Sequence, residues 1–241
     1  MAILTRSAGR ALWLDVARGG ALIAMVAYHF SFDLLLFGMA DWPVGSHPAW
    51  RTFAAAIAST FLFSAGVSLG YAHGAGIRWH PFLRRLAILA ACAALVTIGT
   101  MATMPAPIYF GILHAIATFS VLALPFLRAP VWLTVGAAIL VLFAPTVLAS
   151  PFFNAGVFYP LGLAEVRPFT FDYEPIFPWF SVVLLGVAFA RLRPLPQMRS
   201  EAEPVGPILG ALAFLGRHSL IVYILHQPIL FGLFMGFAAL R

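Results

Sequence analysis

LWLDVARGGALIAMVAYHFSFDLLLFG, residues 12–38, is the stretch that decides the fold of this chain. It is long enough to cross a bilayer, which takes about 20 apolar residues. It nevertheless carries four ionisable side chains, Asp15, Arg18, His29 and Asp33. At about 100° per residue, all four fall within an arc of about 60° on one face of a helix. Ionisable groups at membrane depth are costly and usually mark function, so we interpret this face as a functional site. The alternative is a salt-bridged stripe that only holds helices together.

The composition of the whole chain is typical of an integral membrane protein. Of its 241 residues, 62% are hydrophobic and only 9% are charged. Long apolar runs exclude an outer-membrane barrel, which would show alternation over about ten residues. We therefore predict an all-α, polytopic helical bundle that forms a single domain over residues 1–241. The predicted spans are 12–37, 52–72, 84–103, 108–127, 131–148, 176–190 and 217–239, and a short apolar helix at 208–215 precedes the last.

The arginines predict the orientation. All 14 basic residues are arginine, and the net charge is +6. With the N-terminus inside, ten arginines fall in inner segments and three in outer segments, which is the bias expected of cytoplasmic loops. This topology, N-in and C-out, explains the positive charge without a nucleic-acid partner. Two long outer connections, 38–51 and 149–175, hold proline, glycine and aromatic residues and are expected to fold back on the bundle.

His29 is the strongest candidate for chemistry. Histidine accepts a proton near neutral pH, since its unperturbed pKa is about 6.5. Asp33 lies one turn further on the same face, where it could orient the imidazole and stabilise its cation. A His–Asp pair that serves only as a helix contact is the alternative.

Arg18 suits a phosphate or diphosphate, because a guanidinium binds such groups through two parallel hydrogen bonds. It lies about 16 Å along the helix from His29, toward the inner side. Asp15, one turn before it, could instead neutralise it. Arg84 and Arg85, at the inner end of the span at 84–103, are candidates for the same ligand or ordinary positive-inside residues.

Other candidates could line a cavity. His114 and His226 lie inside spans, and Pro228 after His226 removes a helix hydrogen bond from the Ile224 carbonyl. Each of these histidines could equally be a satisfied core residue. Glu174, in the acidic outer connection, could receive an amine or a sugar, or belong to a solvated rim. The histidines lack close metal-ligand spacing, so no metal is expected.

These features resemble the opening helix of the transmembrane acyltransferases. Arg18 followed by His29 is similar to the heparan-alpha-glucosaminide N-acetyltransferase family, especially its short bacterial members. Four further stretches fit this resemblance: YHFSFDLLLFG (28–38), FLFSAGVSLGYA (61–72), EPIFPWFSVVLLGVAFARL (174–192) and LGRHSLIVYILHQPIL (215–230).

The resemblance implies an enzyme of the bacterial cytoplasmic (inner) membrane. It would transfer an acyl group, in the first place acetyl from cytoplasmic acetyl-CoA, to a hydroxyl or amine of an extracytoplasmic sugar or glycan. In this picture Arg18 helps to hold the acyl-CoA donor and His29 acts as the base, or carries the acetyl group as an intermediate. The lysosomal members have asparagine where His29 stands and a histidine in the following loop, whereas His47 of this chain is out of register. The acceptor and the reacting residue of this chain can therefore differ from those of the lysosomal members.

Two other functions remain open at this point. A small-molecule or proton-coupled transporter would use the same polar stripe as a relay, and an assembly factor would use it as structural glue. Dependence on acyl-CoA separates the enzyme from both. The oligomeric state, including a homo-oligomer, is left open by the sequence.

The topology can be tested by cysteine labelling in a variant that lacks Cys92. With the N-terminus inside, a cysteine introduced at Asn154 should react with a membrane-impermeant reagent from the extracytoplasmic side. Labelling of that cysteine from the cytoplasmic side alone would contradict the predicted orientation.

Overall fold

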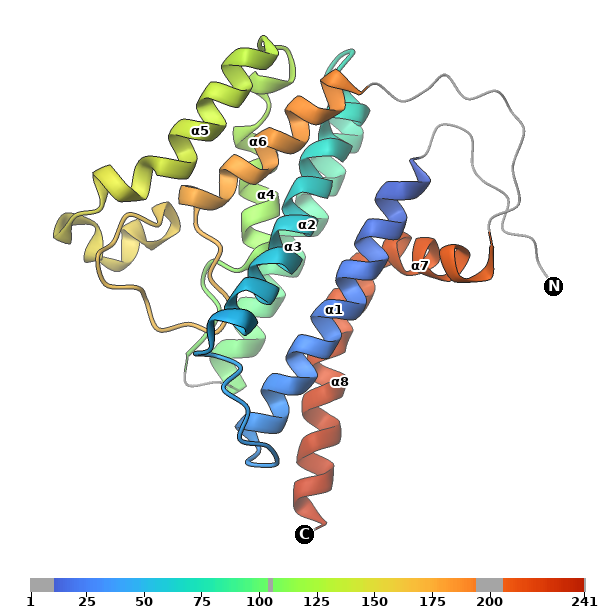
Figure 1. The fold of residues 1–241 in the computed structure, drawn as a ribbon, viewed down its shortest axis with the longest axis vertical. Coiled ribbons are helices and arrows are strands. Elements are labelled where there is room, and N and C mark those ends of the chain that lie inside the picture. The colour runs from blue at the N-terminus through green and yellow to red at the C-terminus, as the bar shows by residue number, and fades with distance from the viewer. Residues whose placement is uncertain (1–10, 104–105, 194–205, 241) are drawn as a thin grey trace. The chain divides into compact units, whose positions relative to one another are not determined.

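The described part of the chain is mainly α-helical. The computed structural model describes residues 11–103, 106–193 and 206–240. Within them the α-helices are α1 (Leu12–Leu36), α2 (Pro48–His73), α3 (Trp79–Thr103), α4 (Ile112–Leu122), α5 (Val131–Leu148), α6 (Ile176–Leu192), α7 (Pro207–Arg217) and α8 (Ser219–Ala239) (Figure 1). Three short 3₁₀ helices are η1 (Pro125–Leu127), η2 (Pro151–Asn154) and η3 (Gly156–Leu161). The described residues contain no strand, and Phe110 and Tyr173 form an isolated β-bridge.

The helices fit the predicted membrane bundle. Among the described residues, five helices are long and apolar enough to cross a membrane: α1, α2, α3, α5 and α8. Helices α4 and α6 lie where two further spans were predicted, but they have 11 and 17 residues. The all-α membrane fold is therefore confirmed, whereas the number of spans and their orientation stay predictions.

Large apolar side chains cover the outside of the long helices. Ile98 on α3 is 66% exposed, Leu140 on α5 is 74% exposed and Leu233 on α8 is 66% exposed. Soluble monomers rarely expose extended apolar surfaces, whereas lipid favours them. These faces are therefore suited to contact with the acyl chains of membrane lipids.

The structure divides into two compact units. The first contains Met1–Phe61 and Leu195–Arg241, and the second contains Leu62–Pro194. Helix α2 passes from the first unit into the second. The single domain expected from the sequence stays a prediction.

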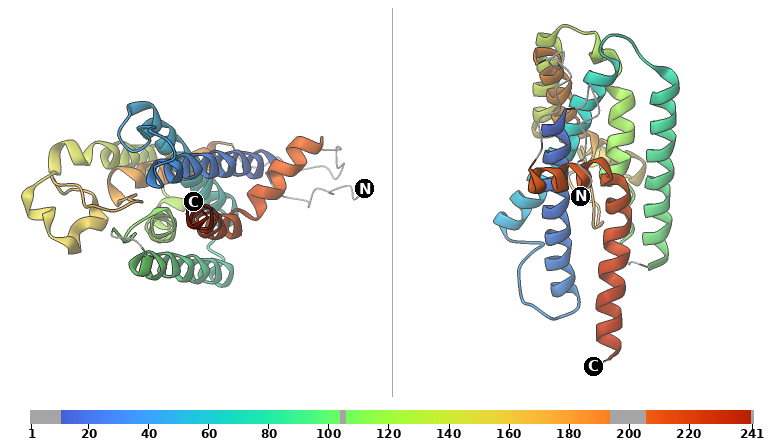
Figure 2. Two further views of the ribbon diagram at one scale, coloured as in Figure 1. Left: turned by 90° about the horizontal axis from the view of Figure 1, so that it is seen from below. Right: turned by 90° about the vertical axis from the view of Figure 1, so that its right-hand side faces the viewer.

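In the first unit, α7 crosses the N-terminal half of α1, and α8 runs beside its C-terminal half (Figure 2). Two glycines permit the crossing. A Cβ atom on Gly19 would collide with the carbonyl oxygen of Leu212, and one on Gly216 would collide with the carbonyl oxygen of Asp15. The backbones of α1 and α7 thus approach without side chains between them, which is how helices pack tightly in lipid.

Further along α1, an apolar cluster joins three helices of the first unit. Leu22 and Met25 of α1 pack with Ile57 of α2, and Val222 and Tyr223 of α8 lie against them. This cluster lies between the two ends of the polar stripe, one of which faces α7 and the other α8.

In the second unit, the small residues of α2 allow close contact with α6. A Cβ on Gly66 would meet the carbonyl oxygen of Val183, and a Cβ on Gly186 would meet that of Phe63. The backbones of α2 and α6 therefore approach closely at these two glycines. On α8, by contrast, a Cβ on Gly232 or Gly236 would meet nothing among the described residues.

The long connection between α5 and α6 folds back on the start of α4, as the sequence predicted. The Asp172 carboxylate accepts the backbone N–H of Ile112 at 2.9 Å, and Glu174 N–H donates to the Phe110 carbonyl at 3.0 Å. Asp172 thereby satisfies one of the free N–H groups of the first turn of α4.

The α2–α6 contact predicts that alanine in place of glycine lowers the stability at Gly66 of α2, whereas it raises the stability at Gly99 of α3, which makes no such contact. Gly66→Ala should lower the stability by about 1–3 kcal/mol, because its methyl group has to displace a backbone carbonyl. Gly99→Ala should raise it by up to about 1 kcal/mol, because a Cβ there meets nothing and alanine favours the helix. Thermal unfolding in detergent measures both, and equal effects would contradict the contact.

Candidate functional site

The four ionisable side chains of α1 all lie on the faces that meet α7 and α8. Asp15 is only 3% exposed and Asp33 is fully buried, while Arg18 and His29 are half-buried. A stripe of this kind is expensive unless each member finds a partner or a ligand. The contacts of the stripe differ between its two ends.

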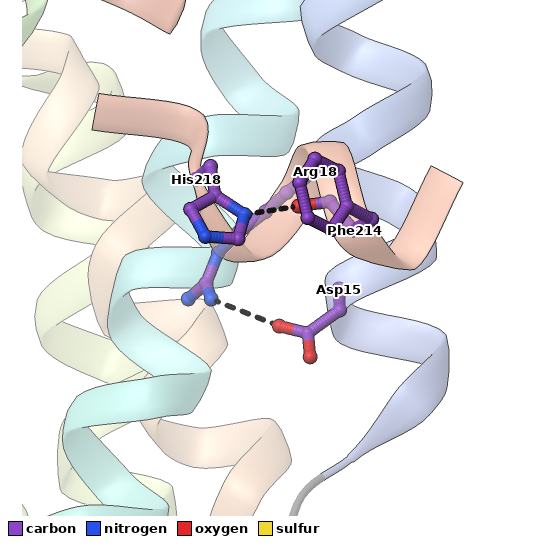
Figure 3. Close-up of polar contacts among 4 residues, drawn as sticks. All are labelled: Asp15, Arg18, Phe214 and His218. Carbon is purple, nitrogen blue, oxygen red and sulfur yellow. Dashed lines mark hydrogen bonds and ion pairs between the residues drawn. The ribbon is translucent and has the colours of Figure 1, made fainter. Parts of the chain in front are cut away.

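At the N-terminal end, Arg18 forms an ion pair with Asp15 at 3.8 Å (Figure 3). This distance exceeds the roughly 2.7–2.9 Å of a charge-assisted hydrogen bond, so the pair is not the bidentate contact that arginine makes with a carboxylate at its best. Between α7 and α8, His218 Nδ1 donates to the Phe214 carbonyl at 2.9 Å. Both contacts lie at the α1–α7 crossing.

At the C-terminal end, His29 meets His226 of α8. The centroids of the two imidazole rings lie 4.9 Å apart. His226 is 9% exposed, and its Nδ1 lies 2.6 Å from the Tyr223 carbonyl. Because a carbonyl only accepts, Nδ1 carries the hydrogen, and Nε2 of the neutral ring carries the lone pair. Nε2 is buried and has no hydrogen-bond partner among the described residues.

Asp33 is held by a residue that the sequence analysis did not single out. Gln227 Nε2 lies 3.0 Å and 3.2 Å from the two Asp33 carboxylate oxygens. The sequence predicted that Asp33 would orient the His29 imidazole, whereas within the described chain its hydrogen bonds run to Gln227. A signal was present, because an amide beside a histidine inside an apolar span is costly unless it has partners.

His114 lies in the second unit. Its Nε2 lies 3.2 Å from the hydroxyl of Thr97, which itself donates to the Ile108 carbonyl at 2.6 Å. The hydroxyl has one hydrogen, so His114 Nε2 donates to it and Nδ1 of the neutral ring is an acceptor. This pairing ties α4 to α3.

Glu174 also belongs to the second unit. Its Oε2 is buried and has no partner among the described residues. Desolvation raises the pKa of this carboxyl to about 9, and the neighbouring Asp172 adds to the shift while Arg167 opposes it. Burial thus favours the uncharged form of Glu174, and its contact with an amine or a sugar stays a prediction.

Arg84 and Arg85 lie in the first turns of α3 and are exposed. Their positions allow either a ligand contact or the ordinary role of arginines at the end of a span. No group of three or more His, Cys, Asp or Glu side chains that could hold a metal ion occurs among the residues described.

A comparison with known protein families identifies the family of this chain. A family model described as "Heparan-alpha-glucosaminide N-acetyltransferase, catalytic" matches residues 10–228, which is most of the chain. The chain belongs to this family. The resemblance seen in the sequence is thus confirmed, and membership implies a membrane acetyltransferase-like function with acetyl-CoA as the suggested donor. No curated protein and no solved structure matches the chain.

The matched region of this N-acetyltransferase family contains every candidate residue named above. It includes α1 with its stripe and reaches Pro228, two residues beyond His226. The family model therefore covers α1 and the first half of α8, the segments that bring the two histidines together.

The raised pKa of Glu174 predicts how stability depends on pH. The folded state keeps the proton up to about pH 9, whereas an unfolded chain loses it near 4.5. This contribution to stability is complete below about pH 4.5 and is lost as the pH rises toward 9. Glu174→Gln should therefore reduce the fall in melting temperature between about pH 5 and about pH 8. The exposed Glu165→Gln is the control, and identical slopes in both variants would contradict the assignment.

Proposed function

We propose that this protein is an acyl-CoA-dependent transmembrane acyltransferase. It moves an acyl group, in the first place acetyl, from cytoplasmic acyl-CoA to a hydroxyl or amine of a sugar or glycan on the other side of the bacterial inner membrane. Family membership supports the acyl transfer, and the arginine bias supports the sidedness.

The observation that carries the proposal is the contact between His29 and His226. Two imidazoles with centroids 4.9 Å apart lie on the facing sides of α1 and α8. A neutral imidazole carries one lone pair that accepts a proton, which is what a general base needs. A pair of this kind suits general-base chemistry better than it suits the association of helices.

The chemistry needs one proton acceptor and one leaving thiolate. The oxygen or nitrogen of the acceptor attacks the acyl carbon of the thioester while His29 takes the proton of that nucleophile. The new C–O or C–N bond forms, the C–S bond breaks, and the CoA thiolate leaves. The proton held on His29 then passes to the thiolate, which restores neutral histidine and gives free CoA.

The other end of the stripe suits the donor. CoA separates its phosphates from its thioester by an extended pantetheine arm, and α1 separates Arg18 from His29 by about 16 Å. Arg18 would hold a phosphate while the thioester reaches toward His29. Arg84 and Arg85 would add positive charge on the same, predicted cytoplasmic, side.

Substitution of His29 tests the proposal. His29→Ala should reduce acetyl transfer per folded molecule about 100- to 10,000-fold, the usual effect of losing a general base, while acetyl-CoA still binds. Release of CoA thiol and thermal unfolding are measured on the same purified samples. His80→Ala, an exposed histidine of α3, is the control and should keep full activity.

Two results would contradict this role. Full activity per folded molecule in His29→Ala would remove the base assignment. A loss of activity that only follows a loss of folded protein would show that the two rings are a structural contact.

A further inference from the structure

Two buried hydrogen-bond acceptors without partners lie on adjacent residues of α8. They are His226 Nε2 and Gln227 Oε1, and neither has a partner among the described residues. Buried polar groups are nearly always hydrogen-bonded, and one left unpaired costs about 1–3 kcal/mol. The His226 ring lies against that of His29, and two unpaired atoms on neighbouring residues of one helix are expected at a place that binds a ligand.

The orientation of the Gln227 amide is fixed by Asp33. A carboxylate only accepts hydrogen bonds, so the amide nitrogen must face it, as the 3.0 Å and 3.2 Å contacts show. The amide oxygen, on the other branch of the same group, is therefore presented as an acceptor.

The orientation of His226 is fixed in the same way by the backbone of its own helix. The Tyr223 carbonyl takes the Nδ1 hydrogen at 2.6 Å. Nε2 of the neutral ring is then an acceptor as well. The Tyr223 carbonyl and the Asp33 carboxylate can only accept hydrogen bonds. Neither the His226 ring nor the Gln227 amide can therefore rotate to present a donor to a ligand without losing its own hydrogen bond.

We infer that His226 Nε2 and Gln227 Oε1 form a two-point recognition site for a hydrogen-bond-donating group of the acyl acceptor, with Asp33 as the positioning residue of Gln227. This inference rests on the proposed acyl transfer and deepens it. The site takes hydroxyl or amino groups, which donate, and discriminates against carbonyl and carboxylate groups, which only accept. It holds the acceptor beside His29, where its proton is removed.

Gln227→Met tests the inference. Methionine is similar in length but has neither the amide donor nor the amide oxygen. The KM for the acceptor should rise about tenfold, as expected for one lost hydrogen bond, with a smaller change in kcat and an unchanged Kd for acetyl-CoA. The probes are glucosamine, which offers an amine, and glucose, which offers only hydroxyls. Leu225→Met, an exposed position of α8, is the control for altering this helix.

A reciprocal exchange separates positioning from stability. Asp33→Asn should raise the acceptor KM, because an asparagine amide lets Gln227 turn in either direction. The double variant Asp33→Asn with Gln227→Glu restores an amide facing a carboxylate and leaves an acceptor oxygen toward the ligand. It should recover most of the lost affinity for the acceptor.

The outcomes distinguish the inference from the proposed function. If the unaltered protein transfers the acyl group and Gln227→Met has the same KM for the acceptor, the inference is overturned. The proposed acyl transfer would then still stand. A fall in melting temperature without a change in KM would assign the Asp33–Gln227 pair a purely structural role. Transfer to neither sugar would contradict the proposed function and the inference together.

Discussion

The fold depends on the cost of burying the ionisable side chains of α1 in an apolar bundle. Asp15 and Asp33 are almost completely buried on a helix that is otherwise apolar. Lipid cannot solvate these groups, so other helices of the same chain have to cover them. Helix α7 covers the first of them and α8 the second. The arrangement of the first unit follows from this requirement.

Close backbone contact and unpaired polar atoms lie at different places along α1. Around Arg18 the helix is packed against α7 through Gly19 and Gly216, and the polar atoms there form an ion pair. Around His29 the partners are a histidine and a glutamine, and two polar atoms of α8 have no partner within the described chain. An incompletely satisfied polar group is a poor way to hold two helices together. This difference is the reason that we propose catalysis at the C-terminal half of the stripe and donor binding at its N-terminal half.

The helices and the polar stripe of α1 could be predicted from the sequence, because hydropathy, helix period and the arginine bias are properties of single segments. The helix at 131–148 was predicted with its observed bounds, and the stripe of α1 follows from the spacing of its residues. The pairing of Asp33 with Gln227 could not be predicted, because a helical wheel gives the face of a residue but not the side chain opposite it. The charge state of Glu174 depends on burial by a folded loop, which the acidic composition of that loop does not reveal.

The central claim is that the buried contact between α1 and α8 works as one catalytic unit. A double-mutant cycle on the rate of CoA release, with His29→Ala, His226→Ala and the double variant, tests it most directly. The account predicts that acetyl-CoA turnover in the double variant falls no further than in the more damaged single variant, because either substitution disables the unit. Losses that multiply, as they do for independent sites, would contradict it.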